Sequence, residues 1–582
     1  MNRRNFIKGG AALTALAFFY PEKIFGGIKV MAAENLKWWQ KTIVYQIYPK
    51  SFQDTTGSGT GDLKGITQHL DYLKKLGVGA IWLTPIYPSP QVDNGYDISD
   101  YTAIDPAYGT MADFENLVAE GKKRGIKIVM DLVYNHSSDK HKWFLESKSS
   151  RTNAKSDWYI WKDAKPDGTP PTNWRSFFGG SVWEWCEERQ QFYMHSFAKG
   201  QPDLNWENPE VRQALFDAAN FWLDKGVGGF RIDTIPYIKK PAYVDGTPDA
   251  KDGMVAVHAV TVNTPGILDF LHEFKDKVFA GHDIFTVGEA NGVAPEDLKY
   301  WIGDNGVFDM IFEFSHVLLP LKNGEVYCRP SEWKLTELKK AISDSQAATK
   351  NNGWYPMYFE NHDKPRCVNY FFKNVDTVKA AKVIATILLT MRGTPFIFEG
   401  QEIGMTNVAW DSIEKYNDVA AYAQFDFAIN EGYNKKEALE FVHFFSRDNA
   451  RTPMQWNNKI NAGFSTDETW LPVNENYKTV NAAAEEKDSD SVLKWYRKLA
   501  KLRADNKELT QGDYKLLLVD SEEIFAFSRS FDGKTLVTAV NFSTQNVKLP
   551  KDFIDAQILI DSEKNADKNI LKPLESRIYK FK

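Results

Sequence analysis

Three acidic residues in this 582-residue chain follow segments that have the pattern of β-strands. In GGFRIDTI, residues 228–235, apolar and charged residues alternate, so Arg231 and Asp233 project from the same side of the strand. A neighbouring guanidinium lowers the pKa of a carboxyl group by roughly 1–3 units and keeps it ionised. Glu289 follows the apolar run FTVG, where partial desolvation raises the pKa of a carboxyl group. Asp363 ends the run FENHD.

Together these three side chains suit the cleavage of a glycosidic bond. Cleavage with retention of configuration needs an ionised nucleophile and a protonated acid roughly 5–5.5 Å apart, on opposite sides of the bond. Asp233 fits the nucleophile and Glu289 fits the acid. Asp363 adds a third negative charge that would steady a positively charged transition state, and the repulsion among the three helps to keep Glu289 protonated.

The segments that carry these residues belong to a regular alternation of strand and helix patterns. Helical spacing is found, for example, over residues 62–77 and 111–124, and eight strand candidates are separated by such stretches: 42–49, 80–85, 126–133, 228–233, 284–288, 308–314, 356–360 and 394–398. This alternation predicts an α/β fold, a (β/α)8 TIM barrel. Active-site residues of such barrels lie at the C-terminal ends of the strands, so we expect the three carboxylates to meet at one rim.

Two interruptions and a terminal segment complete the predicted domain organisation. Residues 135–206 are polar, aromatic and punctuated by Gly and Pro, which indicates a small inserted domain after the third strand. A second interruption, about 403–467, follows strand eight and is expected to lie over the barrel mouth. The catalytic barrel is assigned to 37–134 and 207–506, and the strand-rich residues 507–582 to a C-terminal antiparallel β-sandwich.

Composition restricts the class of partner. A formal charge of −6 is mild for this length, so neither nucleic acid nor a membrane surface is an expected partner. Three cysteines without metal-ligand spacing are expected to be buried thiols. We expect a monomer, although no sequence feature specifies the oligomeric state.

The N-terminus has the pattern of a targeting segment. Arg3 and Arg4 precede an apolar stretch that is too short to span a membrane as a mature helix. Residues 1–33 therefore resemble a twin-arginine export signal and predict a periplasmic protein without a membrane span in the mature chain. An ordinary membrane anchor or a fortuitous arginine pair is the alternative interpretation.

Six segments of the chain resemble the signature regions of glycoside hydrolase family 13, the α-amylase family. They are most similar to the oligo-1,6-glucosidase subfamily, which includes α-glucosidases, dextran glucosidases and sucrose isomerases. The matching stretches are DLVYNH (131–136), QPDLNW (201–206), GGFRIDTI (228–235), TVGEA (286–290), FENHD (359–363) and RDNARTPMQW (447–456). The resemblance implies a retaining mechanism with Asp233 as nucleophile, Glu289 as acid/base and Asp363 as stabiliser. It also implies a set of substrate-binding residues: Asp93, Tyr96, His136, Phe178, Gln201, Arg231, His362 and Arg447.

The chain departs from the family pattern at a loop that binds calcium in many relatives. The relatives read D-x-N-x-D-G-x-G-D, whereas residues 54–62 read DTTGSGTGD, with two oxygen ligands replaced by hydroxyls. Because hard cations prefer carboxylate oxygens, weak calcium binding or none is expected, and no metal or cofactor is assigned.

Two further positions bear on the substrate. Thr234 directly follows the nucleophile. In this subfamily a Val at that position is associated with α-1,6 specificity, and a Thr is associated with α-1,4-linked substrates or sucrose. One such contact changes preference by about 1–3 kcal/mol. Sucrose isomerases carry a charged Arg-Leu-Asp-Arg-Asp-like loop after strand six, and the uncharged residues FSHVLLP (314–320) stand there instead, which favours water as the acceptor.

The resemblance and the residues together predict an exo-acting α-glucosidase. Its substrates would be small oligosaccharides or disaccharides of the maltose, isomaltose or sucrose type, because insertions that close a site into a pocket favour chain ends. A sucrose isomerase or transglucosylase that shares the same glucosyl-enzyme is the first alternative. A non-catalytic barrel that binds carbohydrate or accompanies a transporter is the second, and the presence of all three carboxylates counts against it.

Overall fold

The computed structural model describes residues 36–324, 330–351, 353–564 and 566–581, which lie almost entirely in the second of the chain's two units, Lys37–Lys582. The second unit contains every helix and strand of the described part. The predicted export signal, residues 1–33, lies outside the described residues, as does Cys328; Cys186 and Cys367 are buried free thiols. Within the described ranges, no helix is long and apolar enough to cross a membrane.

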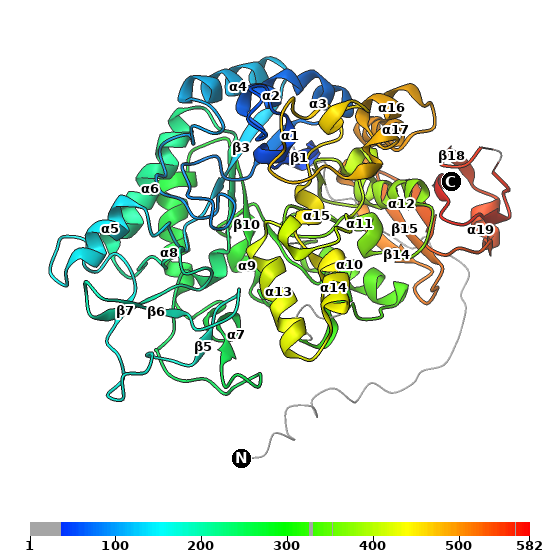
Figure 1. Ribbon diagram of the computed structural model, residues 1–582. Coiled ribbons are helices and arrows are strands. Elements are labelled where there is room, and N and C mark those ends of the chain that lie inside the picture. The colour runs from blue at the N-terminus through cyan, green and yellow to red at the C-terminus, as the bar shows by residue number, and fades with distance from the viewer. Residues whose placement is uncertain (1–35, 325–329, 352, 565, 582) are drawn as a thin grey trace. The chain divides into compact units, whose positions relative to one another are not determined.

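Eight parallel strands form the central sheet, in the order β11-β10-β8-β3-β2-β1-β13-β12. The two outer strands, β11 and β12, contact each other, so the sheet closes into a barrel, which Figure 1 shows with its surrounding helices. The predicted (β/α)8 barrel is therefore confirmed. Its strands are β1 (Val44–Ile47), β2 (Ala80–Leu83), β3 (Lys127–Leu132), β8 (Gly229–Ile232), β10 (Phe285–Glu289), β11 (Met310–Phe312), β12 (Pro356–Met357) and β13 (Thr394–Phe398).

A close approach of two strands fixes the register around the site. Gly229, at the start of β8, has φ +151°, and a Cβ there would lie 2.0 Å from the carbonyl oxygen of Phe285 on β10. Only glycine fits at this distance, and the contact holds β8 against β10. In the resulting register Arg231 stands between Asp131 on β3 and Val287 on β10.

Strand β12 is shorter than the sequence pattern predicts. It ends at Met357, although the apolar pattern continues toward Glu360. The backbone leaves the sheet because Asn361 organises a turn: its side chain accepts a hydrogen bond from the Asp363 N–H at 2.9 Å and its carbonyl accepts one from Lys364 N–H at 3.2 Å. This turn brings the FENHD side chains to the rim of the barrel.

The helical pattern over 62–77 forms two helices rather than one. They are α2 (Leu63–Gln68) and α3 (Leu70–Leu76), and His69 lies between them. The His69 ring stacks on Trp456 at 3.7 Å between ring centres, which anchors the break. Further barrel helices are α4 (Met111–Lys123), α6 (Pro209–Asp224), α8 (Ile267–Phe274), α10 (Leu335–Ala348), α12 (Thr377–Thr390) and α17 (Val492–Asp505).

The inserted segment after β3 has a small core of its own. It contains helix α5 (Lys142–Ser149) and the antiparallel sheet β4-β7-β6, formed by Trp161–Lys162, Gln191–Met194 and Trp183–Cys186. Strand β5 (Trp174–Arg175) pairs in parallel with β9 (Val255–Ala256), which lies about fifty residues beyond the segment in sequence. Val255 and Val257 are apolar and pack in this small core, so the loop after β8 also belongs to it.

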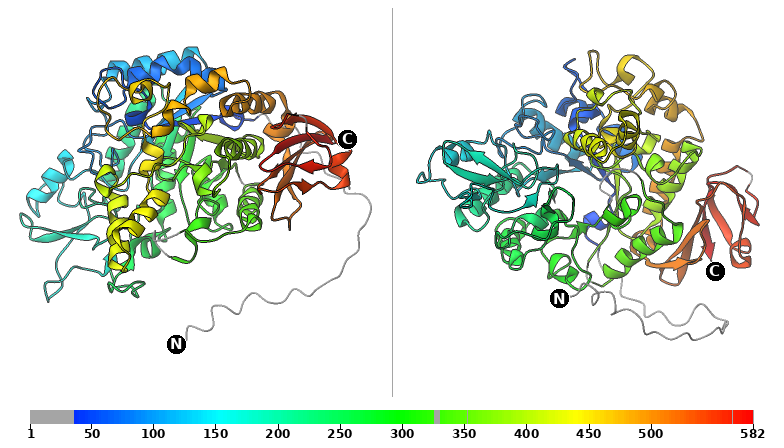
Figure 2. Two further views of the ribbon diagram at one scale, coloured as in Figure 1. Left: turned by 45° about the vertical axis from the view of Figure 1, so that its right-hand side comes forward. Right: turned by 60° about the horizontal axis from the view of Figure 1, so that its bottom comes forward.

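The C-terminal segment is an antiparallel β-domain, as predicted. Its five-stranded sheet has the order β14-β15-β16-β20-β18, and a second, two-stranded sheet pairs β17 with β19. Figure 2 shows this domain and the inserted segment on opposite flanks of the barrel. The strands are β14 (Asp513–Leu517), β15 (Ile524–Phe531), β16 (Lys534–Asn541), β17 (Val547–Lys548), β18 (Gln557–Asp561), β19 (Ile570–Leu571) and β20 (Ser576–Phe581).

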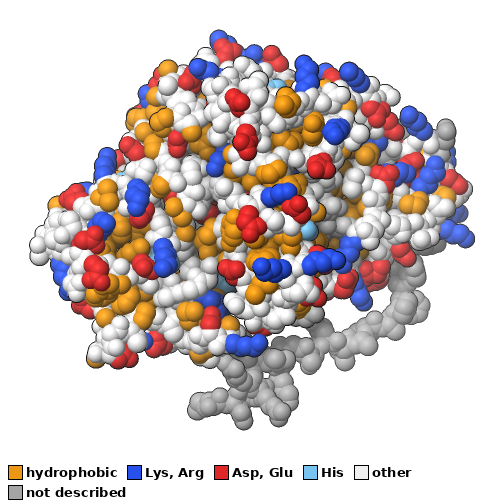
Figure 3. Space-filling model, viewed as in Figure 1, with side chains coloured by type: hydrophobic (Ala, Val, Ile, Leu, Met, Phe, Trp, Pro, Cys, Tyr) orange, Lys and Arg blue, Asp and Glu red, His pale blue; other side chains and the backbone are white. Residues whose placement is uncertain are grey.

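Surface charge is mixed in sign. On the face drawn in Figure 3, acidic and basic side chains are interspersed, with apolar side chains scattered among them. This distribution agrees with the small formal charge of −6.

Candidate active site

Arg231 is the centre of a buried network of carboxylates. Its Nη1 donates to Asp131 at 2.8 and 3.0 Å and to Asp233 Oδ1 at 2.7 Å, and its Nη2 contacts Glu289. These side chains come from β3, β8 and β10, which are neighbours in the barrel. One planar guanidinium thus holds Asp233 and Glu289 on adjacent nitrogens, which keeps the two carboxyl groups close together.

The environments of two rim carboxyl groups move their pKa values apart. Burial is the main cause that raises the pKa of Glu289 from 4.5 to about 8, and the charges of Asp233 and Asp363 add to it against the opposing effect of Arg231. For Asp363, burial also raises the pKa, but His362 and two arginines outweigh it and hold the pKa well below its usual range. Glu289 is therefore suited to carry a proton where Asp363 is ionised.

A group of side chains after β2 and β3 forms one wall of the site. Gln201 Nε2 lies 3.2 Å from Asp93 Oδ2 and 3.1 Å from His136 Nε2. The Tyr96 hydroxyl donates to Asp131 at 3.1 Å, and its ring lies parallel to that of His362 at 5.1 Å. Polar groups of this kind can bind sugar hydroxyls, and Tyr96 adds an aromatic ring to the same wall.

The second interruption, after β13, contributes Arg447 to the same wall. Arg447 Nη2 donates to Asp93 at 2.9 Å and Nη1 to Asp363 at 3.2 Å. Its guanidinium also lies 5.3 Å from the ring centre of Phe178, which belongs to the inserted segment after β3. The two interruptions therefore meet at the barrel mouth, as the sequence predicted for the second of them.

The exposed fractions of the side chains show how deeply each one lies in the site. The exposed fraction is 2% for Arg231, 7% for Asp233, 17% for Glu289 and 33% for Asp363. Arg231 therefore forms the floor, and Asp363 lies nearest the opening. Thr234 follows Asp233 in the left-handed region (φ +40°), and its Oγ1 donates to Asp233 Oδ2 at 3.1 Å.

The structure thus brings all the predicted site residues into one cluster, and it adds others that the sequence reasoning did not select. Asp131 binds Arg231, and burial raises its pKa to about 7. Asp418 accepts a hydrogen bond from Arg447 Nε at 2.9 Å, and Arg451 Nη2 donates to Asp363 at 2.9 Å. Gln46 Nε2 lies 2.7 Å from His362 Nδ1. Asp131 and Arg451 stand inside the segments DLVYNH and RDNARTPMQW, whereas nothing in the local sequence marks Asp418.

The loop of residues 54–62 binds its own backbone through both of its carboxylates. Asp54 accepts hydrogen bonds from the N–H groups of Thr56, Gly57 and Gly59 at 2.8 to 3.0 Å and from the Ser465 hydroxyl at 2.7 Å. Asp62 accepts from Thr55 and Gly65 N–H groups. The described residues contain no group of three or more His, Cys, Asp or Glu that could hold a metal ion.

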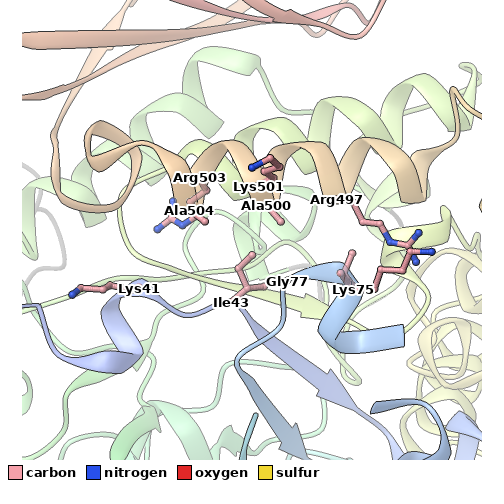
Figure 4. A pocket seen from close by; sticks show the side chains of 10 residues that line it. Lys41, Ile43, Lys75, Gly77, Arg497, Ala500, Lys501, Arg503 and Ala504 are labelled. Carbon is pink, nitrogen blue, oxygen red and sulfur yellow. The ribbon is translucent and has the colours of Figure 1, made fainter. Parts of the chain in front are cut away.

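A groove at the opposite end of the barrel is separate from this site. It has a volume of about 190 Å³ and lies where Ile43 and Gly77 precede β1 and β2 (Figure 4). Its middle is apolar. In Figure 4 Lys75 and Arg497 meet at one end of the groove, where both pair with Glu486, and Lys41 lies at the other end.

Carboxyl groups with separated pKa values at the carboxyl-end rim of a (β/α)8 barrel fit the requirements of glycoside hydrolysis. Residues 46–512 match the family model of the alpha-amylase catalytic domain, and the chain belongs to this family, glycoside hydrolase family 13.

Relatives place the chain in the oligo-1,6-glucosidase subfamily. It is 43% identical to the oligo-1,6-glucosidase of Parageobacillus thermoglucosidasius, over 94% of this chain and 99% of the relative. It is 42% identical to the trehalose-6-phosphate hydrolase of Bacillus subtilis, over 95% of this chain and 99% of the relative. The crystal structure of an isomaltulose synthase from Protaminobacter rubrum superposes with a TM-score of 0.89 at 39% identity, covering 94% of this chain and 100% of that one.

Proposed function

We propose that the protein is a retaining, exo-acting α-glucosidase that removes terminal non-reducing glucose from short α-glucosides. The observation that carries the proposal is the shared contact of Arg231 with Asp233 and Glu289. Retention requires two carboxyl groups on either side of one bond, roughly 5–5.5 Å apart, and a single guanidinium that contacts both supports such a separation. The similarity to oligo-1,6-glucosidases over almost the whole chain supports the same activity.

The first step forms a covalent glucosyl-enzyme. Asp233 attacks the anomeric carbon, and its carboxylate forms an ester while the bond to the leaving oxygen breaks. Glu289 gives its proton to that oxygen, so the leaving sugar departs as a neutral alcohol. Arg231 Nη1 donates to Asp233 Oδ1 at 2.7 Å and orients it for the attack, and Nη2 then faces the newly formed Glu289 carboxylate and stabilises it. The developing positive charge of the sugar ring lies next to ionised Asp363.

The second step returns the enzyme to its starting state. The Glu289 carboxylate takes a proton from water, and the resulting hydroxide oxygen bonds to the anomeric carbon as the ester bond to Asp233 breaks. Glu289 is then protonated again, and two inversions leave glucose in the α configuration. Each step balances in atoms and charge without another reactant.

Recognition of a chain end follows from the wall beside the nucleophile. Asp93 and Arg447 form an ion pair at 2.9 Å that closes the site behind the sugar, since Asp93 follows β2 and Arg447 belongs to the interruption after β13. Ionised side chains of this kind bind sugar hydroxyls with charge-assisted hydrogen bonds. His136, Gln201 and His362 supply further polar atoms around the same space. A blocked wall leaves room for one terminal glucose and excludes the middle of a chain.

A sucrose isomerase is the second candidate, because the isomaltulose synthase superposes closely. Isomerisation requires that released fructose stays bound while the glucosyl ester waits. The residues FSHVLLP (314–320) occupy the loop after β11, and they lack the charged residues of isomerases at this place. We therefore place hydrolysis first.

The experiment that tests this proposal compares maltose, isomaltose and sucrose side by side. Glucose release is measured enzymatically, and proton NMR follows the anomer formed first. We expect glucose from at least one disaccharide, with α-glucose appearing before the β anomer. Isomaltulose or trehalulose as the main product from sucrose would replace hydrolase with isomerase, and β-glucose as the first product would exclude retention.

We further propose that residues 1–33 direct export to the periplasm and that the mature enzyme is a monomer. The support is the Arg3-Arg4 pair ahead of a short apolar stretch, in a part of the chain outside the described residues. Replacement of both arginines by lysine should leave the enzyme in the cytoplasmic fraction of the cells that express it. Sedimentation of the mature chain should give the mass of one copy.

A further inference from the structure

Lys364 follows strand β12, one residue after Asp363. Asp93 and His136 follow β2 and β3, whereas Phe314 and Lys364 follow β11 and β12, which are diametrically opposed to them in the strand order. The Lys364 Nζ is 5.4 Å from the centre of the Phe314 ring. Glu289 comes from β10, next to β11, so an acid, an aromatic ring and an ammonium follow three successive strands.

Among the residues that the structure describes, none accepts a hydrogen bond from the ammonium group of Lys364. The side chain is half-buried and interacts electrostatically with Asp363 and Glu289, yet among the described residues no carboxylate or carbonyl lies within bonding distance of Nζ. Lys240, which is also near the site, differs, because its Nζ binds Asp203 at 2.8 Å. Burial lowers the pKa of Lys364, as expected for a charge removed from water without compensation.

The position of the acid shows which part of a substrate meets Lys364. Glu289 must reach the oxygen between the terminal glucose and the leaving group. If the glucose lies against the wall of Asp93 and Arg447, the leaving group lies beyond Glu289, on the side of Phe314 and Lys364. This step rests on the α-glucosidase function proposed above.

We propose that Lys364 recognises the leaving sugar by donating hydrogen bonds to its hydroxyl groups. These bonds make the enzyme prefer disaccharides over glucosides whose leaving group lacks hydroxyls. A neutral sugar supplies the acceptors that Nζ lacks, and Phe314 offers an apolar surface to the sugar ring. An anionic leaving group fits less well, because the carboxylates of Asp233 and Asp363 lie in the same opening.

The test compares two substrates in the full-length enzyme. The disaccharide that the parent hydrolyses best is set against phenyl α-glucoside, whose leaving group carries no acceptor for Lys364 beyond the glycosidic oxygen. In Lys364→Met, kcat/KM for the disaccharide should fall about 10- to 100-fold, the range for loss of a hydrogen bond from a charged donor. The value for the aryl glucoside should fall less than about threefold, because that substrate makes no such bond. Lys364→Gln keeps a neutral donor and should lie between parent and Met variant for the disaccharide.

Controls separate this role from a structural one and from the proposed function itself. Lys122→Met, on the exposed face of α4, should match the parent on both substrates. Equal losses on both substrates in Lys364→Met, or no loss on either, would overturn the proposal. A much larger loss on trehalose 6-phosphate than on neutral disaccharides would also overturn it, in favour of an anionic leaving group. If the parent hydrolyses neither substrate, the α-glucosidase function fails and the role of Lys364 fails with it.

Discussion

The pKa of Glu289 predicts where activity declines at alkaline pH. A carboxyl group with a pKa of about 8 instead of 4.5 favours its protonated form by about 5 kcal/mol more than a free glutamate does, an order-of-magnitude figure. The acid acts in the protonated form, so kcat/KM is full below this pKa and falls about tenfold per pH unit above it. A glutamate with an ordinary pKa would already have lost the proton near pH 5. We therefore expect kcat/KM to decline above about pH 8, which is the alkaline limb of the pH profile.

The assay measures kcat/KM from pH 5 to 10 for a disaccharide and for α-glucosyl fluoride, whose leaving group needs little protonation. In Glu289→Gln, kcat/KM for the disaccharide should fall about 10²–10⁴-fold, which is the usual contribution of a general acid. The value of kcat/KM for the fluoride, which reports the glucosylation step, should fall much less. The alkaline limb should disappear for the fluoride in this variant. An alkaline limb at pH 5 in the parent, or an unchanged limb in Glu289→Gln, would refute the assignment of the acid.

Three further predictions concern specificity, stability and the response to calcium. Thr234→Val removes the hydroxyl that donates to Asp233 at 3.1 Å. It should change the ratio of kcat/KM for maltose to kcat/KM for isomaltose in favour of isomaltose, by the equivalent of about 1–3 kcal/mol. Thr234→Ser keeps the hydroxyl and should keep the parent ratio. Asp54→Asn replaces one acceptor oxygen of a carboxylate that binds three backbone N–H groups and Ser465, and it should lower the free energy of unfolding by about 1–3 kcal/mol. Added calcium or a chelator should leave the melting temperature of the parent unchanged, because both carboxylates of that loop are occupied; a rise of several degrees with calcium would contradict this.

The barrel and its rim could be predicted because they depend on local patterns. Strand and helix periods alternate along the chain, and the carboxyl ends of parallel strands meet at one edge whatever lies between them. Arg231 lies on β8 and Asp233 directly follows it, two residues later, so their contact at 2.7 Å is a local one that the sequence spacing predicts.

Other parts of the site depend on contacts between distant segments. Asp418 faces Arg447 only because the interruption after β13 folds back on itself, and no local pattern specifies that fold. The break at His69 depends on stacking with Trp456, almost four hundred residues later, and the helical period of 62–77 gives no sign of it. Lys364 was not selected either, because its position beside Phe314, with no hydrogen-bond acceptor among the described residues, depends on three-dimensional packing.

The central claim is that Asp233 forms an ester with glucose while Glu289 supplies the proton. The most direct measurement is to trap that ester with 5-fluoro-α-glucosyl fluoride, digest the enzyme and locate the added mass by tandem mass spectrometry. We predict one fluoroglucosyl group on the peptide that contains GGFRIDTI, attached to Asp233, and none in Asp233→Asn. Attachment to Glu289 or Asp363, or the same adduct on a different residue in Asp233→Asn, would contradict the account.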